Sequence, residues 1–234
     1  MNPYIKLLVS QSLQWIPGSI GEKFETRALW AQRQLRARSS GDEFEQELSR
    51  LTKESICIDL GANVGDITAK LASVAGHVHA FEPGQWAFKQ LQAKVGHLEN
   101  VSLYNAAIGA EDGTMMLFED PGFEERPEVY SQGTSAFKSV LWKEGQPKGF
   151  EVEVIGLSRF LRSLPKPVDL LKVDIEGAEV ALINALLDSP EASLVKVMFV
   201  ETHECQIPEL RKSTKVLRTR LAGLSQPKTY LEWH

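Results

Sequence analysis

The sequence predicts an α/β fold in which a parallel sheet carries helices on both faces. Two observations carry this prediction. From residue 55 onward, short apolar runs alternate with helical stretches, and the runs are continuously apolar, as in strands that are buried on both faces. Right-handed crossovers between such strands give a doubly wound, Rossmann-like arrangement. With 234 residues, 43% of them hydrophobic and 24% charged, the chain can bury a sizeable core.

Each expected strand is a short apolar run, and most of these runs are followed by a helical stretch. The runs lie at residues 55–60 (SICIDL), 77–81 (HVHAF), 101–108, 168–173 (VDLLKV) and 195–200 (VKVMFV). Helices are expected at residues 66–75, 86–95, 178–187 and 208–221, and a last strand at residues 229–233.

Two segments depart from this alternation. Residues 1–54 are locally basic and carry apolar stripes at helical spacing, which predicts a helical N-terminal extension acting as a packed segment, a lid or an interaction surface. Within the remaining domain, residues 55–234, strands at 113–118 and 150–155 flank a long polar loop at about residues 119–149. Its aromatic residues, Tyr130, Phe137 and Trp142, either stack on a ligand or anchor the loop.

Net charge, cysteine content and hydropathy limit the kinds of binding partner and the cellular location that we expect. A net charge of −5 argues against a nucleic-acid partner. Only two cysteines, Cys57 and Cys205, occur, which excludes a disulfide framework and fits a reducing, cytoplasmic location. No apolar stretch reaches about 18 residues, so stable membrane insertion is not expected. These features leave the oligomeric state undetermined.

The first chemical motif, DLGANVGD at residues 59–66, occupies the first strand-to-helix turn. Gly61 and Gly65 allow the backbone to approach a ligand closely, and the helix that follows offers free amides to an anion. Asp59 places a negative charge where an ammonium group could bind. The motif lacks the third glycine of G-x-G-x-x-G, so a zwitterionic cofactor such as S-adenosylmethionine fits better than a pyrophosphate. The candidate cofactor-binding residues here are Asp59, Gly61, Ala62, Asn63, Val64, Gly65 and Asp66.

Two further strand ends complete the expected cofactor site. Glu82 ends the second strand at about the 20-residue distance from Gly61 at which an acid accepts both ribose hydroxyls. Such an acid suits the adenosine of either NAD or S-adenosylmethionine. Pro83 stops the strand and helps to orient Glu82. After the third strand, the small residues in the stretch Asn105, Ala106 and Ala107 leave room for an adenine ring.

The expected catalytic residues follow the fourth and fifth strands: Asp174, Glu176, Glu201 and His203. Neighbouring parallel strands end at one edge of a sheet, so these side chains can converge. They supply either a general base or a set of oxygen and nitrogen metal ligands. We expect His203 or Asp174 to be the base, with Glu201 orienting the pair. A metal is not predicted, although a divalent metal at the same carboxylates stays open. Glu179 is expected on the face of the next helix.

The order of these motifs resembles the FkbM family of S-adenosylmethionine-dependent methyltransferases. The resemblance covers roughly residues 55–204 and rests on residues 59–66, 81–83, 105–109, 133–135 (GTS), 171–179 and 200–203. It implies a class I methyltransferase fold with S-adenosylmethionine as methyl donor. The acceptor it implies is typically a hydroxyl of a sugar, a polysaccharide component or a natural product. It also implies that the cofactor cradle is formed by Asp59, Gly61, Asn63, Gly65 and Glu82. The reacting end would hold Asp174, Glu176, Glu201 and His203, and the loop at 133–135 would cover the cofactor or acceptor.

Two features depart from the family pattern, and two other functions stay open. Residues 1–54 lie outside the resemblance, and the C-terminus is short for the antiparallel hairpin that normally ends a class I sheet. A nicotinamide-dependent oxidoreductase on a similar sheet is one alternative. A non-catalytic S-adenosylmethionine-binding module is the other.

Overall fold

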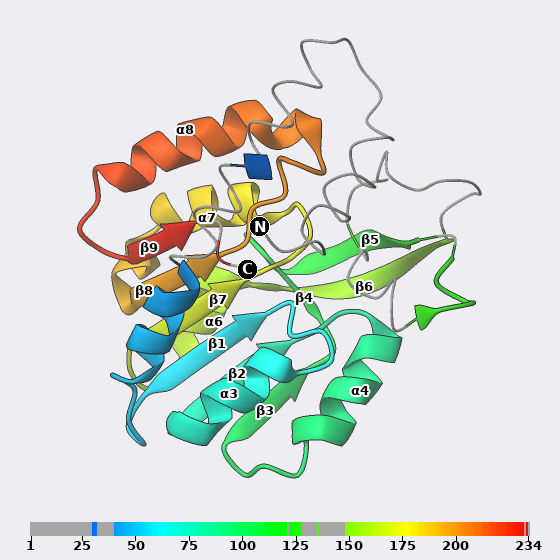
Figure 1. Ribbon diagram of the computed structural model, residues 1–234, viewed down its shortest axis with the longest axis horizontal. Helices are drawn as coiled ribbons and strands as arrows, with labels where there is room; N and C mark the ends of the chain where they lie inside the picture. The colour runs from blue at the N-terminus through cyan, green and yellow to red at the C-terminus, as the bar shows by residue number, and fades with distance from the viewer. Residues whose placement is uncertain are drawn as a thin grey trace.

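A six-stranded, fully parallel sheet forms the centre of the computed structural model, which describes residues 30–31, 40–120, 122–127, 135, 148–231 and 233. Its strand order is β3-β2-β1-β7-β8-β9, so the chain changes direction across the sheet between β1 and β7 (Figure 1). Ligands of such sheets bind at this switch point, beyond the carboxyl ends of the strands. The predicted α/β fold is confirmed. The strands are β1 (Ile56–Leu60), β2 (His77–Phe81), β3 (Val101–Tyr104), β7 (Val168–Val173), β8 (Val195–Val200) and β9 (Lys228–Leu231).

Helices cover both faces of this sheet because its strands are apolar on both sides. All five residues of β1 are buried. Cys57 packs in one cluster with Leu71, and Ile58 packs in another cluster with Ile183. The first face carries α3 (Asp66–Val74), α4 (Gln85–Val95) and the helical residues 40–48, and the second carries α6 (Leu157–Ser163), α7 (Glu179–Leu187) and α8 (Arg211–Ala222).

Part of the predicted N-terminal extension belongs to the core. Phe44, in the helical residues 40–48, is 3% exposed, and its ring lies 5.1 Å from that of Phe199 and 4.9 Å from that of Trp233. The other apolar stripes expected in residues 1–39 lie outside the described residues, except for the helical residues 30–31. The boundary at residue 54 stays a prediction.

The third predicted strand is divided between two sheets. β3 ends at Tyr104, and β4 (Ala107–Gly109) pairs with β6 (Lys148–Gly156) in a second sheet of order β4-β6-β5, where β5 is Gly113–Glu119. Between them, the Asn105 side-chain amide donates to the backbone oxygens of Glu82 at 2.9 Å and Pro83 at 3.2 Å. These side-chain bonds hold the chain against the end of β2 at the point where strand pairing stops. The ribbon of β5 and β6 extends beyond the central sheet (Figure 1).

The C-terminal strand differs from the hairpin that the family resemblance implies. Helix α8 connects β8 to β9, and β9 pairs with β8 in parallel. A helical crossover returns the chain to the end of the sheet where β8 began, so the next strand must run in the same direction. Among the described helices, none combines the length and apolar character needed to span a bilayer.

Candidate active site

A cavity of about 970 Å³, including its open mouth, lies at the carboxyl ends of the central strands. Apolar lining comes from Leu60, Phe81, Ile108, Met115, Leu117 and Ile175. The predicted site residues that line it are Gly61, Asn63, Glu82, Pro83, Ala106 and Ala107 from the cofactor set, and Asp174, Glu176 and Glu201 from the catalytic set.

The glycine loop after β1 needs Gly61 because the loop presses against the backbone just after β7. Gly61 has φ +74°, and a Cβ at this position would lie 1.7 Å from the backbone oxygen of Asp174. Gly65 has φ +90° and caps α3. Asn63 also adopts the left-handed region, with φ 47°. Non-glycine residues in this region are uncommon and cluster at ligand-binding loops.

Asp59 lies beneath this loop and does not line the cavity. It is fully buried, and its Oδ2 accepts a hydrogen bond from the Thr68 hydroxyl at 2.7 Å. Its Oδ1 lies 3.2 Å from the Lys172 ammonium. The structure therefore corrects the expectation that Asp59 faces a ligand ammonium, because Lys172 already occupies that position.

Lys172 is a site residue that the sequence reasoning missed. It is 3% exposed, donates to the Gly61 backbone oxygen at 2.7 Å and lies 3.5 Å from the Asp174 carboxylate. Burial alone would lower the pKa of Lys172, but the Asp59 and Asp174 carboxylates raise it. The available signal was a lysine inside the apolar run VDLLKV, since a buried lysine needs anionic partners.

Glu82 joins two turns and still faces the cavity. Its carboxylate accepts the backbone N–H of Asn63 at 2.9 Å and that of Gly84 at 2.7 Å. Burial raises the pKa of Glu82 to about 7, although these two N–H groups favour its charged form. Each carboxylate oxygen has a further lone pair, so Glu82 can accept additional hydrogen bonds.

Several other predicted cofactor residues support the loop without lining the cavity. Ala62 is buried with Leu91 between α3 and α4. Asp66, in the first turn of α3, pairs with Lys94 at 2.5 Å. Asn105 turns its amide to the backbone, as described above. Val64 and Gly65 also lie outside the cavity lining.

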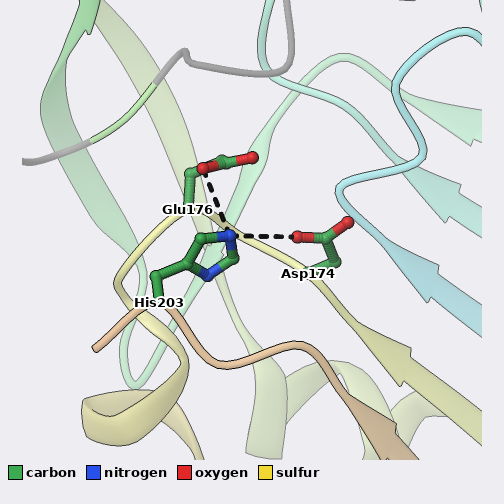
Figure 2. Close-up of side chains that lie close together, drawn as sticks. All are labelled: Asp174, Glu176 and His203. Carbon is green, nitrogen blue, oxygen red and sulfur yellow. Dashed lines mark ion pairs between the residues drawn. The ribbon is translucent and has the colours of Figure 1, made fainter. Parts of the chain in front are cut away.

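Asp174, Glu176 and His203 come together at the ends of β7 and β8 (Figure 2). His203 Nε2 lies 3.3 Å from Glu176 Oε2 and 3.7 Å from Asp174 Oδ1. The His203 side chain is 4% exposed. Glu201, the fourth predicted residue, lines the same cavity.

The electrostatics of this cluster assign a different role to His203 from the one expected. Burial alone would lower the pKa of His203, but the Glu179, Glu176 and Asp174 carboxylates outweigh it and raise that pKa to about 10. Burial raises the pKa of Glu176 to about 8 and also raises the pKa of Asp174. The surrounding carboxylates therefore favour the protonated form of His203, which argues against His203 as the proton acceptor.

Glu179 is buried and contacts His203, whereas we expected it to lie on the face of the helix. It is 0% exposed, and its Oε1 lies 2.8 Å from His203 Nδ1. It also accepts the backbone N–H of Ile175 at 3.1 Å and that of Gly177 at 3.0 Å. A carboxylate in the first turn of a helix can bind amides that lack helical partners, and its place in α7 was the signal for this role.

One described residue of the long loop contacts the cluster. The Ser135 hydroxyl donates to the backbone oxygen of Glu176, and Ser135 pairs through its backbone with Phe118. The structure therefore anchors this part of the loop motif at the site. The other loop residues singled out above, Tyr130, Gly133, Thr134, Phe137 and Trp142, lie outside the described residues.

A comparison with models of protein families identifies one domain family. The methyltransferase FkbM domain matches residues 59–225. Methyltransferase 1 of Beauveria bassiana (strain ARSEF 2860) is 32% identical over 151 residues, which cover 58% of this chain and 59% of that protein. Methyltransferase sdnD of Sordaria araneosa is 26% identical over 182 residues, covering 68% of this chain and 70% of that protein.

Similar proteins also occur among solved structures. The crystal structure of methyltransferase FkbM from Methylobacillus flagellatus KT has a TM-score of 0.36 and 14% sequence identity, and the match covers 58% of this chain and 30% of that one. The chain thus spans about three fifths of the Beauveria protein's length and less of the Methylobacillus chain. The family match at residues 59–225 includes the glycine loop, Glu82 and the whole Asp174–His203 region. The chain belongs to the methyltransferase FkbM domain family.

Proposed function

We propose that this chain is an S-adenosylmethionine-dependent methyltransferase that acts on a hydroxyl group. The observation that carries the proposal is a single cavity lined both by the glycine loop with Glu82 and by three carboxylates, those of Asp174, Glu176 and Glu201. The loop and the carboxylates are adjacent, because Gly61 packs directly on the Asp174 backbone. A cofactor held by the first set would therefore lie beside the second.

The residues present suit the cofactor. Glu82 offers hydrogen-bond acceptors to ribose hydroxyls. Ala106 and Ala107, next to the apolar Ile108, leave space for a flat ring. Asn63 Oδ1 is a buried oxygen that receives no hydrogen bond from the described residues, and it would accept one from a ligand ammonium or hydroxyl. S-adenosylmethionine, when bound, supplies a methyl group already activated by its sulfonium.

The chain's own contribution is to orient the acceptor and to take its proton. We assign proton acceptance to a carboxylate of the cavity, Asp174, Glu176 or Glu201, because the carboxylates around His203 favour its protonated form. A base whose pKa lies near the working pH contributes roughly 10²- to 10⁴-fold, and the pKa of about 8 at Glu176 lies in that range. We propose a sugar, a polysaccharide component or a natural product as the acceptor, in keeping with the net charge of −5.

A ligand comparison tests this function. Isothermal calorimetry with S-adenosylhomocysteine, S-adenosylmethionine, NADH and NAD is expected to show heat for the two sulfur ligands alone. Glu82→Gln should weaken their binding about tenfold or more, because one carboxylate acceptor becomes an N–H donor. The exposed Glu153→Gln serves as control. Binding of NADH without S-adenosylhomocysteine would instead support an oxidoreductase.

A methyl-transfer assay distinguishes an enzyme from a non-catalytic S-adenosylmethionine-binding module. A panel of hydroxyl-bearing acceptors is incubated with S-adenosylmethionine carrying a labelled methyl group. Asp174→Asn, Glu176→Gln and Glu201→Gln are then compared, and loss of the base should reduce the rate roughly 10²-fold or more while cofactor still binds. Cofactor binding with no transfer to any acceptor would support the non-catalytic alternative.

We also infer a reducing, cytoplasmic setting. Cys57 and Cys205 are both buried, and neither is in a disulfide. Burial raises the pKa of the Cys57 thiol to about 12, so it is an unreactive core residue. Localisation of the tagged full-length protein in cells tests this setting.

A further inference from the structure

We propose that Asp174, Glu176 and His203 form a binding site for a divalent cation beside the cavity (Figure 2). Cation binding itself can be measured without any methyl transfer. The role of the cation in catalysis rests on the function proposed above.

The donor atoms lie near the separation that one ion requires. One ligand atom from each of the three side chains lies within 4.8 Å of the others. His203 Nε2 is 3.3 Å from Glu176 Oε2 and 3.7 Å from Asp174 Oδ1. Neighbouring ligands at about 2.1 Å from a cation are about 3.0–3.4 Å apart. Small side-chain rotations would therefore close the site.

The buried carboxylate of Glu179 contacts the second ring nitrogen of His203, Nδ1. Glu179 Oε1 lies 2.8 Å from His203 Nδ1 in an ion-pair contact, while Nε2 lies near Asp174 and Glu176. Metal-binding histidines almost always donate their second ring N–H to a carboxylate, a backbone oxygen or water. Glu179 is itself held by the backbone N–H groups of Ile175 and Gly177. A negative charge therefore lies beside Nδ1, and a small ring rotation would let Nδ1 donate a hydrogen bond to it.

A buried oxygen of Asp174 gives independent support, because its ion-pair contact with His203 Nε2 is long, at 3.7 Å. Asp174 Oδ1 is buried and accepts no hydrogen bond from the described residues. The Lys172 ammonium does not bind this oxygen. It lies 3.5 Å from the other oxygen of Asp174, Oδ2, and it also contacts the Asp59 carboxylate and the Gly61 backbone oxygen. Buried anionic oxygens without a hydrogen bond are costly. A divalent cation bound to His203 Nε2 would release the Nε2 proton to solvent and contact Asp174 Oδ1 in its place.

The donor types indicate which cation to expect. Two carboxylates with one imidazole suit Mn²⁺, Fe²⁺ or Zn²⁺, whereas Ca²⁺ takes oxygen ligands. Asp174 and Glu176 both line the cavity, so the remaining coordination positions would face it. A divalent cation there would supply Lewis-acid chemistry next to an acceptor oxygen. Glu201, outside the three-ligand set, lines the same cavity and would keep a proton-accepting role.

Manganese titration of the full chain tests the site. The protein is stripped with EDTA and titrated with Mn²⁺, and the electron paramagnetic resonance signal of free Mn²⁺ reports binding. We expect one strong site per chain, and weaker binding of Ca²⁺ in parallel calorimetry. His203→Gln and Glu176→Gln should each weaken Mn²⁺ binding at least tenfold. Glu179→Gln should weaken it roughly 10- to 100-fold through His203.

A control variant and a measurement of folding accompany the titration. Glu151→Gln, at an exposed position of β6, should leave Mn²⁺ affinity unchanged. Circular dichroism identifies variants that fail to fold, and Glu176, with a side chain 30% exposed, offers the mildest change. If the folded native chain takes up no Mn²⁺, or if the Glu176 variant binds it as tightly, the cluster is only an ion-pair network. S-adenosylhomocysteine calorimetry on the metal-free sample separates this failure from failure of the proposed function.

Discussion

The Lys172 ammonium lies 3.2 Å from the Asp59 carboxylate, and the two residues are direct partners in the register of β1 and β7. Asp59 is 0% exposed and Lys172 is 3% exposed. Because Lys172 also donates to the Gly61 backbone oxygen, this ion pair joins the two central strands to the glycine loop. The strand pairing thus determines where the loop sits above the cavity.

Removing the ammonium should strongly destabilise the fold. Lys172→Met leaves Asp59 buried and without its cation, which costs about 3–5 kcal/mol of unfolding free energy. Urea denaturation at neutral pH measures this loss. Lys196→Met is the matched control, because Lys196 forms an exposed pair with Asp169 at 2.7 Å and should contribute about 1 kcal/mol or less. Equal losses in the two variants would show that the buried pair has no special structural role.

A methyl group at Gly61 should displace the loop. In Gly61→Ala the new Cβ would meet the Asp174 backbone oxygen at 1.7 Å, at a φ that side chains rarely adopt. We expect lower thermal stability and at least tenfold weaker binding of S-adenosylhomocysteine. Gly113→Ala has nothing within 4 Å of its new Cβ, so it should leave both quantities nearly unchanged. Normal ligand affinity in Gly61→Ala would contradict the loop's role in the site.

Glu82 should make stability fall as the pH rises toward neutrality. Its pKa is raised from an ordinary value of 4.5 to about 7 by burial, so the native state holds this proton more tightly than the unfolded state does. The free energy of unfolding therefore decreases by up to ~3 kcal/mol as the pH rises from about 4.5 to about 7.

Glu82→Gln tests this dependence because glutamine does not titrate. Urea denaturation at about pH 5 and about pH 7.5 should show a smaller pH-dependent loss in the variant than in the native chain. Glu153→Gln, at an exposed position, should retain the native difference. An unchanged pH dependence in Glu82→Gln would show that this carboxyl is not the group responsible.

Phe44 should stabilise the domain although it lies in the predicted N-terminal extension. Its ring packs against Phe199 and Trp233, so Phe44→Ala should cost about 3–5 kcal/mol. Val216→Ala, on the exposed side of α8 at 60% exposure, should change stability by about 0.5 kcal/mol or less. Guanidinium denaturation compares the two. A small effect at Phe44 would indicate that the helical residues 40–48 dock only loosely.

The regular part of the fold was predictable because its signals are local. A continuously apolar run such as VKVMFV can be buried on both faces wherever it lies in the chain, and it forms β8 as expected. The division at Asn105 was less visible. Residues 101–108 are apolar enough for one strand, and only the hydrogen bonds from Asn105 to the end of β2 show where pairing stops.

By itself, the sequence determined the α/β alternation, the positions of the turns and the residue types gathered at the strand ends. These depend on local hydropathy and on the rule that parallel strands end at one edge. Only the tertiary structure decided which charges meet. It pairs Asp59 with Lys172 instead of a ligand, buries Glu179 next to His203 and surrounds that imidazole with carboxylates that raise its pKa. The physical reason is that pairing and pKa depend on burial and on neighbours far apart in the chain.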